Sequence, residues 1–523
     1  MGLPHPPRSG FRRDAVGGVR HSAAPILVAA LFAGIVAAGM ARAGERAAPD
    51  LDRIDEFIRA EMNAQQIAGL ALAITLDGKP VHVRGFGFAR TGEPVTRRTQ
   101  FRIASLSKSF TAVAVLQLVE AGALDLDAPL ARYLPAFAPA APDLAGITIR
   151  QLLNQTSGLA DSGFVDGLGA RQTDLATRVA GIGTARQVAA AGSAFQYFDP
   201  NYQLLARLVE LASGQAFDDY LQTRIFKPFG MQDSISTSTT DAAAQLAPRL
   251  ARGHLVAYGM PLGAAELAGF VGGSGGVVSS AQDMARYLAA QDSGTRGGGG
   301  AALSASGFAL MRTPPGGSAS GYGMGWFKGS ADGLATIEHN GILSTFYSEA
   351  VLLPHSGYGF VLLYNEYALS AAMFAFPALK NGVAALLAGH EPVPSRVSLP
   401  LLGLLLGAFS AVAIGLAGIS LLRLSRWARR SAGQPAWRAL PAVLWALAPA
   451  LLLLGLPRLV LLASGRYFDH AMLARAMPEV VAVLVICGAL GGVNAMARAL
   501  ILMRRALPGL AVDGRLIPAT GAR

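Results

Sequence analysis

The sequence has a single cysteine and little charge, and each shortage excludes a class of protein. Cys487 alone forms neither a disulfide framework nor a cysteine-based metal site. Only 15% of the 523 residues are charged, whereas 52% are hydrophobic, and the mean hydropathy is +0.40. The chain is too apolar for an ordinary soluble protein and too polar for a purely membrane-embedded one, so we expect a mixed architecture.

The net charge of +11 is distributed unevenly along the chain. Residues 1–43 contain five Arg against one Asp, and residues 398–523 contain thirteen Arg against three acidic residues. The stretch 44–397 is left with a net charge of −3. Because the basic excess flanks apolar runs, it indicates membrane topology, and nucleic-acid binding loses its main support.

The first apolar run, residues 25–40, follows an Arg-bearing start and leads into Ala41-Arg42-Ala43. A charged start, a short apolar stretch and an A-x-A site predict a secretory signal peptide over residues 1–43. The alternative is an uncleaved anchor, for which the run is short. With either, the following region is exported.

Three further apolar segments predict an all-α transmembrane domain over residues 399–523. They lie at 399–422, 439–457 and about 480–497. Arg residues gather in the 423–438 connection and in the tail after the third segment, and the positive-inside rule places both on the cytoplasmic side. The region 44–397 is then periplasmic or extracellular, and the chain is a multi-pass membrane protein with a cytoplasmic C-terminus.

The exported region opens with helical apolar spacing at 51–66 and a hairpin at 69–89 that turns at Asp77-Gly78. A helical segment then runs from after Phe101 to Gly122. Further helices are predicted at 147–154, 200–213, 217–224, 280–290 and 368–388, and further strands at 334–339, 347–353 and 357–364. Strands at both ends with helices between them predict an α+β fold whose sheet is closed by both chain ends.

The boundaries of this exported domain follow from composition. We place the domain at residues 44–390 and a linker at 391–398. The Gly- and Ser-rich run 291–306 is predicted to be a surface loop.

The sharpest chemical signal is Ser105-Leu106-Ser107-Lys108 at the start of a helix. Three residues apart on a helix, Ser105 and Lys108 share a face, so the amine can take the hydroxyl proton as the oxygen attacks a carbonyl. Free N–H groups at the helix start lie near the developing oxyanion. The spacing alone is weak, but no other lysine in the chain has a serine three residues before it.

Two further elements could complete such a site. Tyr197 lies in a turn-like segment before a helix, and a phenol beside a lysine can relay protons, although a buried aromatic role is the commoner one. His339-Asn340-Gly341 ends a predicted strand, where the histidine can line a cleft and the N–H of Ile342 can complete an oxyanion hole. A lone histidine is more often structural.

In this order the three elements resemble the serine β-lactamase and penicillin-binding protein superfamily, specifically its class C-like serine hydrolases, which include D-alanyl-D-alanine carboxypeptidases and esterases. Further matches follow in order within residues 50–390. They are TIRQLLNQTSGL at 148–159, KPFGM at 227–231, GGVVSSAQDM at 275–284 and YGMGW at 322–326. The resemblance implies a β-lactamase/transpeptidase-like α+β fold, with an antiparallel sheet flanked by helices and a helical subdomain.

The resemblance also implies roles for residues. Ser105 would be the nucleophile, Lys108 the general base and Tyr197 an assistant in proton transfer, with oxyanion N–H groups from Ser105 and Ile342. The reaction is acyl transfer through an acyl-enzyme, without metal or cofactor. His339 stands where classical β-lactamases carry the Lys of Lys-Thr-Gly, which weakens a specific claim of penicillin hydrolysis because a fixed cation for the substrate carboxylate is missing.

The family motif is Tyr-x-Asn, and this chain departs from it by having Asp199 in the position of the Asn. An aspartate near Lys108 favours the ammonium, raises the pKa of Lys108 and lowers the fraction of neutral base at pH 7.

A second serine motif lies at Gly272–Gly276, which matches the G-x-S-x-G nucleophile elbow, but no helix follows Ser274 directly. We interpret that segment as a Gly-rich loop bordering the cleft.

The sequence predicts a membrane-anchored extracytoplasmic serine hydrolase that acts on a small ester, amide or D-alanyl peptide, as a carboxypeptidase, esterase or β-lactamase. The alternative is a catalytically silent membrane protein of the same fold that binds or senses cell-wall fragments. Asp199 favours this alternative and the Ser105/Lys108 pair opposes it. The expected partners are a small-molecule or peptide substrate and membrane lipid, and the oligomeric state stays open.

Overall fold

The structure is a computed structural model, and it describes residues 49–135, 137, 141–164, 174–295, 302–316 and 320–506. The predicted signal segment, residues 1–43, lies outside the described residues. The elements below all belong to one unit that begins at Asp50. We call residues 50–398 the sheet domain and residues 399–506 the helical bundle.

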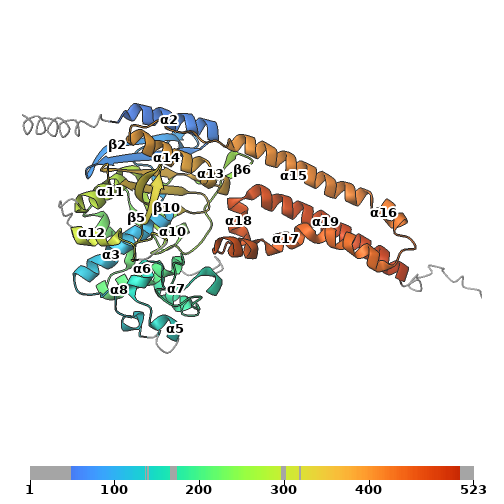
Figure 1. Cartoon of the computed structure of the whole chain (residues 1–523), viewed down its shortest axis with the longest axis horizontal. Helices are drawn as coiled ribbons and strands as arrows, with labels where there is room; N and C mark the ends of the chain where they lie inside the picture. Colours follow the sequence, from blue (N-terminus) through green and yellow to red (C-terminus); the bar gives the residue numbers. More distant parts are fainter. Residues whose placement is uncertain are drawn as a thin grey trace, which may run out of the picture. The chain divides into compact units, whose positions relative to one another are not determined.

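A seven-stranded antiparallel sheet forms the centre of the sheet domain (Figure 1). Its strands, in spatial order, are β3 (Glu93–Pro94), β2 (Lys79–Arg90), β1 (Gly69–Leu76), β12 (Tyr358–Tyr364), β11 (Tyr347–Leu353), β10 (Leu334–Ile342) and β9 (Phe327–Ala331). β1 pairs with β12, so strands from the two ends of the domain meet at the middle of the sheet, as predicted. The predicted hairpin turn is also present, with positive φ at Asp77 and Gly78.

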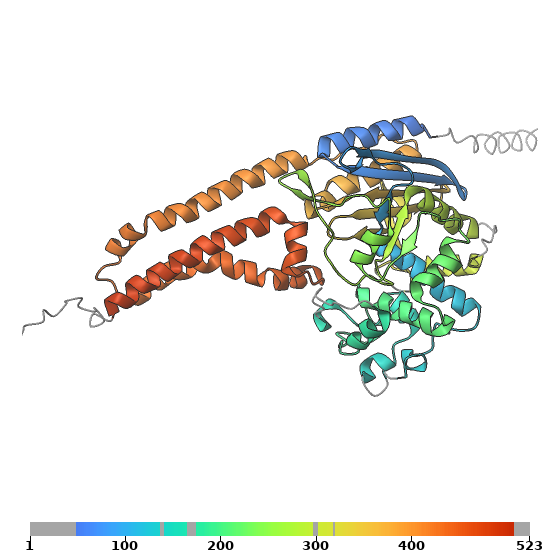
Figure 2. The ribbon, with the colours of Figure 1, turned by 180° about the vertical axis from the view of Figure 1, so that it is seen from behind.

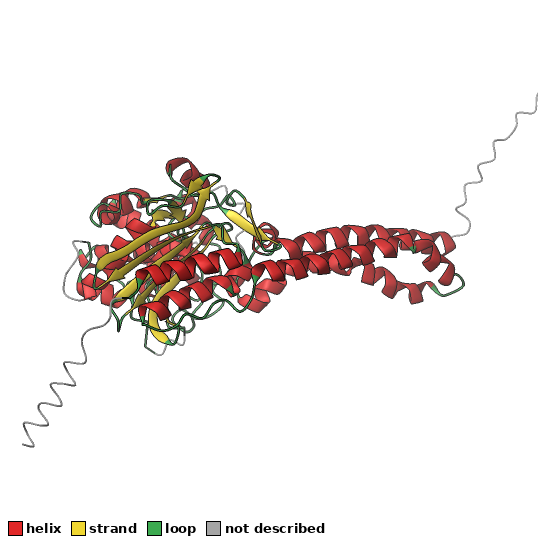
Figure 3. Ribbon diagram, turned by 90° about the horizontal axis from the view of Figure 1, so that it is seen from above, coloured by secondary structure: helices red, strands yellow, loops and turns green. Residues whose placement is uncertain are grey.

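Each face of this sheet is covered by helices (Figure 3). Alternate side chains of β1 point to opposite sides, so Leu70 and Leu72 belong to the core under α2 (Leu51–Gln65) and α14 (Ala375–Leu387). Ala71 and Ala73 belong to the larger core, which is covered by α11 (Ala281–Thr295). Small alanines on that face let α11 approach the strands closely.

The helical subdomain lies between the first and last strands in sequence. α3 (Ser107–Glu120) and α8 (Asp199–Ser213) pack on each other at its centre. Its other helices include α5 (Pro142–Ala145), α6 (Ile149–Leu153), α7 (Leu175–Ile182), α9 (Phe217–Leu221), α10 (Thr240–Leu246) and α12 (Ala305–Met311), whereas α13 (Leu369–Met373) follows the last strand and packs against α14. Two small sheets, β13-β6-β7 and β4-β8-β5, complete it; their strands are β4 (Gln100–Arg102), β5 (Ile235–Ser236), β6 (His254–Ala257), β7 (Met260–Gly263), β8 (Val277–Ser280) and β13 (Glu366–Tyr367).

The helical bundle contains three long apolar helices that lie side by side (Figure 2). They are α15 (Leu399–Leu422), α17 (Leu440–Ser464) and α19 (Pro478–Ala506), with the short helices α16 (Leu424–Arg430) and α18 (His470–Ala476) between them. By length and composition, four stretches of the described residues qualify as membrane spans, where three were expected from the sequence. The additional one, Leu369–Leu387, comprises α13 and α14 and is half-buried, because it also serves as a core helix of the sheet domain.

Two local expectations need correction. The helix expected from Phe101 onward begins only at Ser107, because Phe101 lies in β4 and pairs with Ser279 of β8. The expected loop at 291–306 is entered by α11, which continues to Thr295, and by α12, which begins at Ala305. Residues 296–301 of that run lie outside the described residues.

The core predicts a clear difference between two phenylalanines. Phe110 is fully buried, and its ring stacks on Tyr287 at 4.0 Å between centroids, whereas Phe88 is 60% exposed on β2. We expect Phe110→Ala to lower the free energy of unfolding by about 3–5 kcal/mol, because it leaves a cavity, and Phe88→Ala to change it by less than about 0.5 kcal/mol. Urea unfolding of the full chain in detergent measures both, and equal effects would contradict the described core.

Candidate active site

The chain around Ser105 is held in an unusual conformation between β4 and α3. Ser105 lies in a 3-10 turn, Ala104–Leu106, and Ala104 has a φ of 48°, which is rare for a residue with a side chain. β10 passes directly against this turn. A Cβ on Gly341 would lie 2.3 Å from the carbonyl oxygen of Ile103 and 3.0 Å from the nitrogen of Ser105, so only glycine permits this approach.

Lys108 is fully buried one turn after Ser105. Its Nζ donates hydrogen bonds to Ser105 Oγ at 3.1 Å, to Asp199 Oδ1 at 2.6 Å and to the carbonyl oxygen of Ser274 at 2.9 Å. An ammonium has three donors, and here all three are used. The Gly-rich loop around Ser274 therefore borders the site, as expected from the sequence. It leads into a strand, β8, and not into the helix that a nucleophile elbow requires.

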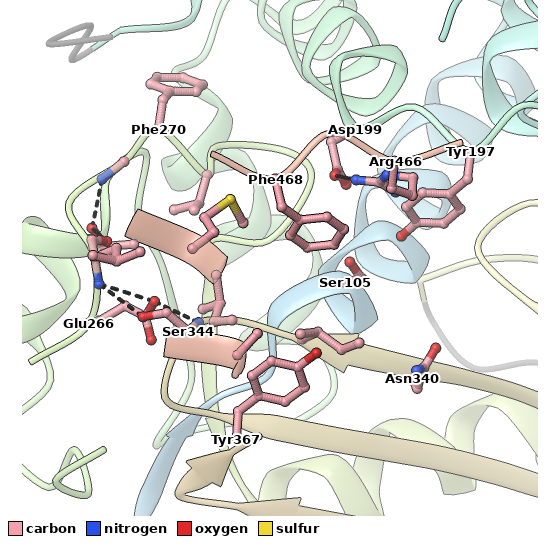
Figure 4. Close-up of a pocket in the computed structure, with 18 of the residues that line it drawn as sticks. Ser105, Tyr197, Asp199, Glu266, Phe270, Asn340, Ser344, Tyr367, Arg466 and Phe468 are labelled. Atoms are coloured by element: carbon pink, nitrogen blue, oxygen red, sulfur yellow. Dashed lines mark hydrogen bonds and ion pairs between the residues drawn. The ribbon is translucent and has the colours of Figure 1, made fainter. Parts of the chain in front are cut away.

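Asp199 is the first residue of α8, where the helix N-terminus favours a negative charge. One carboxylate oxygen accepts from Lys108, and the other accepts from Arg466 Nη2 at 2.7 Å (Figure 4). Arg466 lies between α17 and α18 of the helical bundle, and its Nε donates to Asp161 Oδ2 at 2.9 Å. An arginine from the bundle thus joins the ion network of the sheet domain.

The network sets the charges around Ser105. Burial disfavours charge on Lys108, but the carboxylate of Asp199 outweighs burial and raises the pKa of Lys108 above its usual value. Burial likewise opposes the charge on Asp199, yet the cations Lys108 and Arg466 hold the pKa of that carboxyl well below its usual range. Lys108, Asp199 and Arg466 are therefore all ionised near neutral pH.

Tyr197 lies between the two cations, in the segment just before α8. Lys108 Nζ is 5.0 Å from the centroid of its ring, and the guanidinium carbon of Arg466 is 4.8 Å from it. Both distances are within the range of cation–π contacts. The phenol predicted to assist proton transfer is thus close to Lys108, and it lines the same cavity as Ser105 (Figure 4).

His339 is buried on β10 among aromatic rings, with Tyr197 and Tyr322 within 6.2 Å between centroids. Burial and the nearby charge of Lys108 lower the pKa of His339 to about 3, so the ring is neutral. Its Nδ1 lies 2.6 Å from the carbonyl oxygen of Asn340, and its Nε2 has no partner among the described residues. The side chain provides no cation for a substrate carboxylate.

The remaining predicted residues lie at the end of β10. Gly341 is in the close contact with Ser105 described above, and Ile342 is 40% exposed. Ile342 and Ser105 together line two adjoining cavities, of about 410 and 190 Å³. The structure thus brings the predicted residues Ser105, Lys108, Tyr197, Asp199, His339, Gly341 and Ile342 to one site, although Lys108, His339 and Gly341 do not line either cavity.

Sequence reasoning missed Arg466 and Asp161. Arg466 lies in the connection that the predicted topology places outside the membrane, where arginine is not expected from the positive-inside rule. An arginine outside the membrane and an aspartate in place of the family's asparagine are together the signal that could have suggested the Arg466–Asp199 ion pair. Within the ranges that the structure describes, no group of three or more His, Cys, Asp or Glu side chains is arranged to hold a metal ion.

Over most of the sheet domain the sequence is similar to known proteins. A family model described as beta-lactamase matches residues 54–381. Penicillin-binding protein 4 of Amycolatopsis lactamdurans is 33% identical over 314 residues, which cover 57% of this chain and 81% of that protein. A D-aminopeptidase of Cereibacter sphaeroides is 28% identical over 65% of this chain and 64% of its own length. Esterase EstB of Burkholderia gladioli is 33% identical over 35% of this chain and half of its own length.

Solved structures of similar fold include penicillin-binding proteins. The octameric penicillin-binding protein homologue from Pyrococcus abyssi superposes with a TM-score of 0.56 at 25% identity, covering 66% of this chain and 78% of its own. A penicillin-binding protein from Bacillus halodurans superposes with a TM-score of 0.52 at 25% identity, covering 63% and 98%. In both cases about two thirds of the present chain is covered.

Proposed function

Because the chain belongs to the beta-lactamase family, we propose that it is a membrane-anchored serine hydrolase that cleaves a small ester, amide or D-alanyl peptide through an acyl-enzyme. The observation that carries this proposal is the hydrogen bond of 3.1 Å between Lys108 Nζ and Ser105 Oγ in a cleft. A nucleophile and its base within hydrogen-bond reach are the signature of covalent catalysis. Relatives named as peptidase, esterase and penicillin-binding proteins support the same reaction class.

In the acylation step Ser105 Oγ attacks the carbonyl carbon of the substrate. The resting Lys108 is an ammonium, so it must first lose a proton before it accepts the one from Ser105. The N–H groups of Ser105 and Ile342 stabilise the developing oxyanion. Tyr197 then passes its phenolic proton to the leaving group and takes one from Lys108, so the proton removed from Ser105 is replaced on the leaving group. In the second step water attacks the acyl-enzyme and loses a proton to Lys108, the bond to Ser105 Oγ breaks, and Lys108 passes that proton to Ser105 as the acid leaves.

The cellular arrangement follows from the arginine distribution. With residues 423–438 and the C-terminal tail on the cytoplasmic side, the sheet domain and the connection that carries Arg466 both lie outside the membrane. The contact of Arg466 with Asp199 requires the two to be on the same side, which agrees with α15 and α17 both crossing the membrane, whereas the outward orientation rests on the arginines alone. The signal peptide and the cytoplasmic C-terminus are parts of the same proposal.

Covalent labelling tests the nucleophile. We expect a fluorophosphonate to add one adduct to the full-length protein in detergent, because Ser105 is activated by Lys108, and we expect Ser105→Ala to abolish the adduct. Ser193→Ala, which alters an exposed serine on the segment leading to Tyr197, is the matched control and should label like the wild type. Intact-mass spectrometry measures all three.

A parallel incubation with a penicillin separates the substrate classes. An adduct on Ser105 with penicillin would favour D-alanyl peptides, and an adduct with the fluorophosphonate alone would favour esters. A folded protein that gives no adduct with either reagent would contradict the proposed hydrolase and support the catalytically silent binding protein.

The charge of Asp199 predicts the pH dependence of this reaction. Asp199 favours the ammonium and raises the pKa of Lys108, so removing its charge lowers that pKa and leaves more neutral amine at a given pH. Asp199→Asn should therefore move the acid limb of the labelling rate to lower pH. Asp219→Asn, on the exposed side of α9, should leave it in place. An unchanged acid limb in Asp199→Asn would remove Asp199 from the mechanism.

A further inference from the structure

The connection between the last two long helices reaches the candidate active site. α17 ends at Ser464 and α19 begins at Pro478, and we call residues 465–477 the bridging segment. Arg466 attaches it to Asp199 and Asp161, and the backbone N–H of Tyr467 donates to the same carboxylate of Asp161 at 2.8 Å. The segment is therefore bound to the sheet domain by an ion network and not merely adjacent to it.

The bridging segment contributes to both cavities beside Ser105. Arg466 and Met472 line the cavity of about 410 Å³ and the cavity of about 190 Å³. The smaller cavity has charged or polar walls at Asp161 and Gln203. The larger one has a different character, because most of its walls are aromatic or aliphatic.

The apolar walls of the larger cavity come from two parts of the chain. The sheet domain provides Phe195, Phe270, Phe327, Ile342 and Leu343. The bridging segment provides Phe468, Met472 and Ala476, and Figure 4 shows Phe468 beside Ser105 on the side opposite β10. Without the bridging segment this cavity would lack one wall.

The charged groups that line the larger cavity already have hydrogen-bond or ion-pair partners within the protein. Arg466 is held by two aspartates. The carboxylate of Glu266 accepts from the backbone N–H groups of Ser344 and Thr345 and from the Thr345 hydroxyl. No charge in this lining needs a charged group of a ligand, so the cavity suits the apolar part of a substrate.

We infer that the bridging segment completes a substrate pocket for an apolar chain, so that the preferred substrate is an ester or amide carrying such a chain next to the scissile bond. This inference rests on the proposed function, and it names the substrate class of the same site. This wall of the pocket lies where two candidate membrane spans end. The apolar chain of the substrate can therefore belong to a membrane-borne molecule or to a dissolved ester.

Two ester series measured with the full-length protein in detergent test the pocket. One series lengthens the acyl side, as p-nitrophenyl acetate, butyrate and hexanoate, and the other lengthens the alcohol side, as propyl, pentyl and heptyl acetate. We expect kcat/KM to rise in at least one series by roughly fourfold per methylene, the factor for full burial of that group. A flat dependence in both series would overturn the inference.

Filling the pocket tests whether the bridging segment forms it. Met472→Trp should abolish the chain-length preference, and Ala476→Leu provides a second variant that narrows the same wall. Met503→Trp introduces the same change at an exposed position of α19, away from the pocket lining, and should behave like the wild type. A preference that both pocket variants retain would also overturn the inference.

Labelling separates this inference from the proposed function. A small dimethyl fluorophosphonate should still label Ser105 in Met472→Trp, because the nucleophile is untouched. Labelled Ser105 with no chain-length preference would overturn the pocket alone, whereas wild type without label would overturn both.

A further experiment in vesicles identifies whether the apolar substrate is membrane-borne or dissolved. The protein is reconstituted in phosphatidylcholine vesicles that contain 4-methylumbelliferyl palmitate. Hydrolysis that is lost in Met472→Trp would support the pocket and assign a membrane-borne substrate. Hydrolysis of dissolved p-nitrophenyl hexanoate alone, with the same loss in Met472→Trp, would support the pocket and assign a soluble ester.

Discussion

The carboxylate of Asp199 lies between two cations, and the chemistry available to Ser105 depends on how its charge is shared. One oxygen bonds to Lys108, the residue that also contacts Ser105, and the other bonds to Arg466 of the helical bundle. A carboxylate that faced Lys108 alone would hold the amine more firmly as an ammonium. By binding the second oxygen, Arg466 draws part of this charge away and also adds a cation whose repulsion opposes charge on Lys108.

The rest of the fold positions this shared charge. The central sheet is closed by strands from both ends of the domain, and β10 lies in its interior beside the turn that carries Ser105. α3 and α8, packed on each other, bring Lys108 and Asp199 together from distant parts of the sequence. Burial of Lys108 excludes water and strengthens each of its three hydrogen bonds.

Much of the fold could be predicted from the sequence because its signals are local. The 3.6-residue spacing at 51–66 and the Asp77-Gly78 turn are contained in short stretches, and both predicted elements are present. The boundary before Ser107 was wrong because β4 forms only by pairing with β8, about 180 residues later. The span count differed because one apolar helix, α14, serves as a core helix.

In the candidate site, too, contacts between sequence neighbours could be predicted and contacts between distant residues could not. Ser105 and Lys108 are neighbours on one turn, so their contact could be anticipated, whereas the pairing of Asp199 with Arg466 joins residues 267 positions apart. Neither hydrophobic periodicity nor motif spacing in the sequence predicts a contact between residues so far apart. In the sequence Asp199 is only a departure from the family motif, and the structure gives it a partner.

The measurement that tests this account most directly is the pH dependence of Ser105 labelling in Arg466→Met, with Arg466→Lys as the charge-conserving control. Removing Arg466 leaves the Asp199 charge to Lys108 and removes a repelling cation, so both effects raise the pKa of Lys108. We predict that the acid limb moves to higher pH in Arg466→Met and stays closer to wild type in Arg466→Lys. An acid limb unchanged in Arg466→Met would contradict the claim that the helical bundle contributes to the active site.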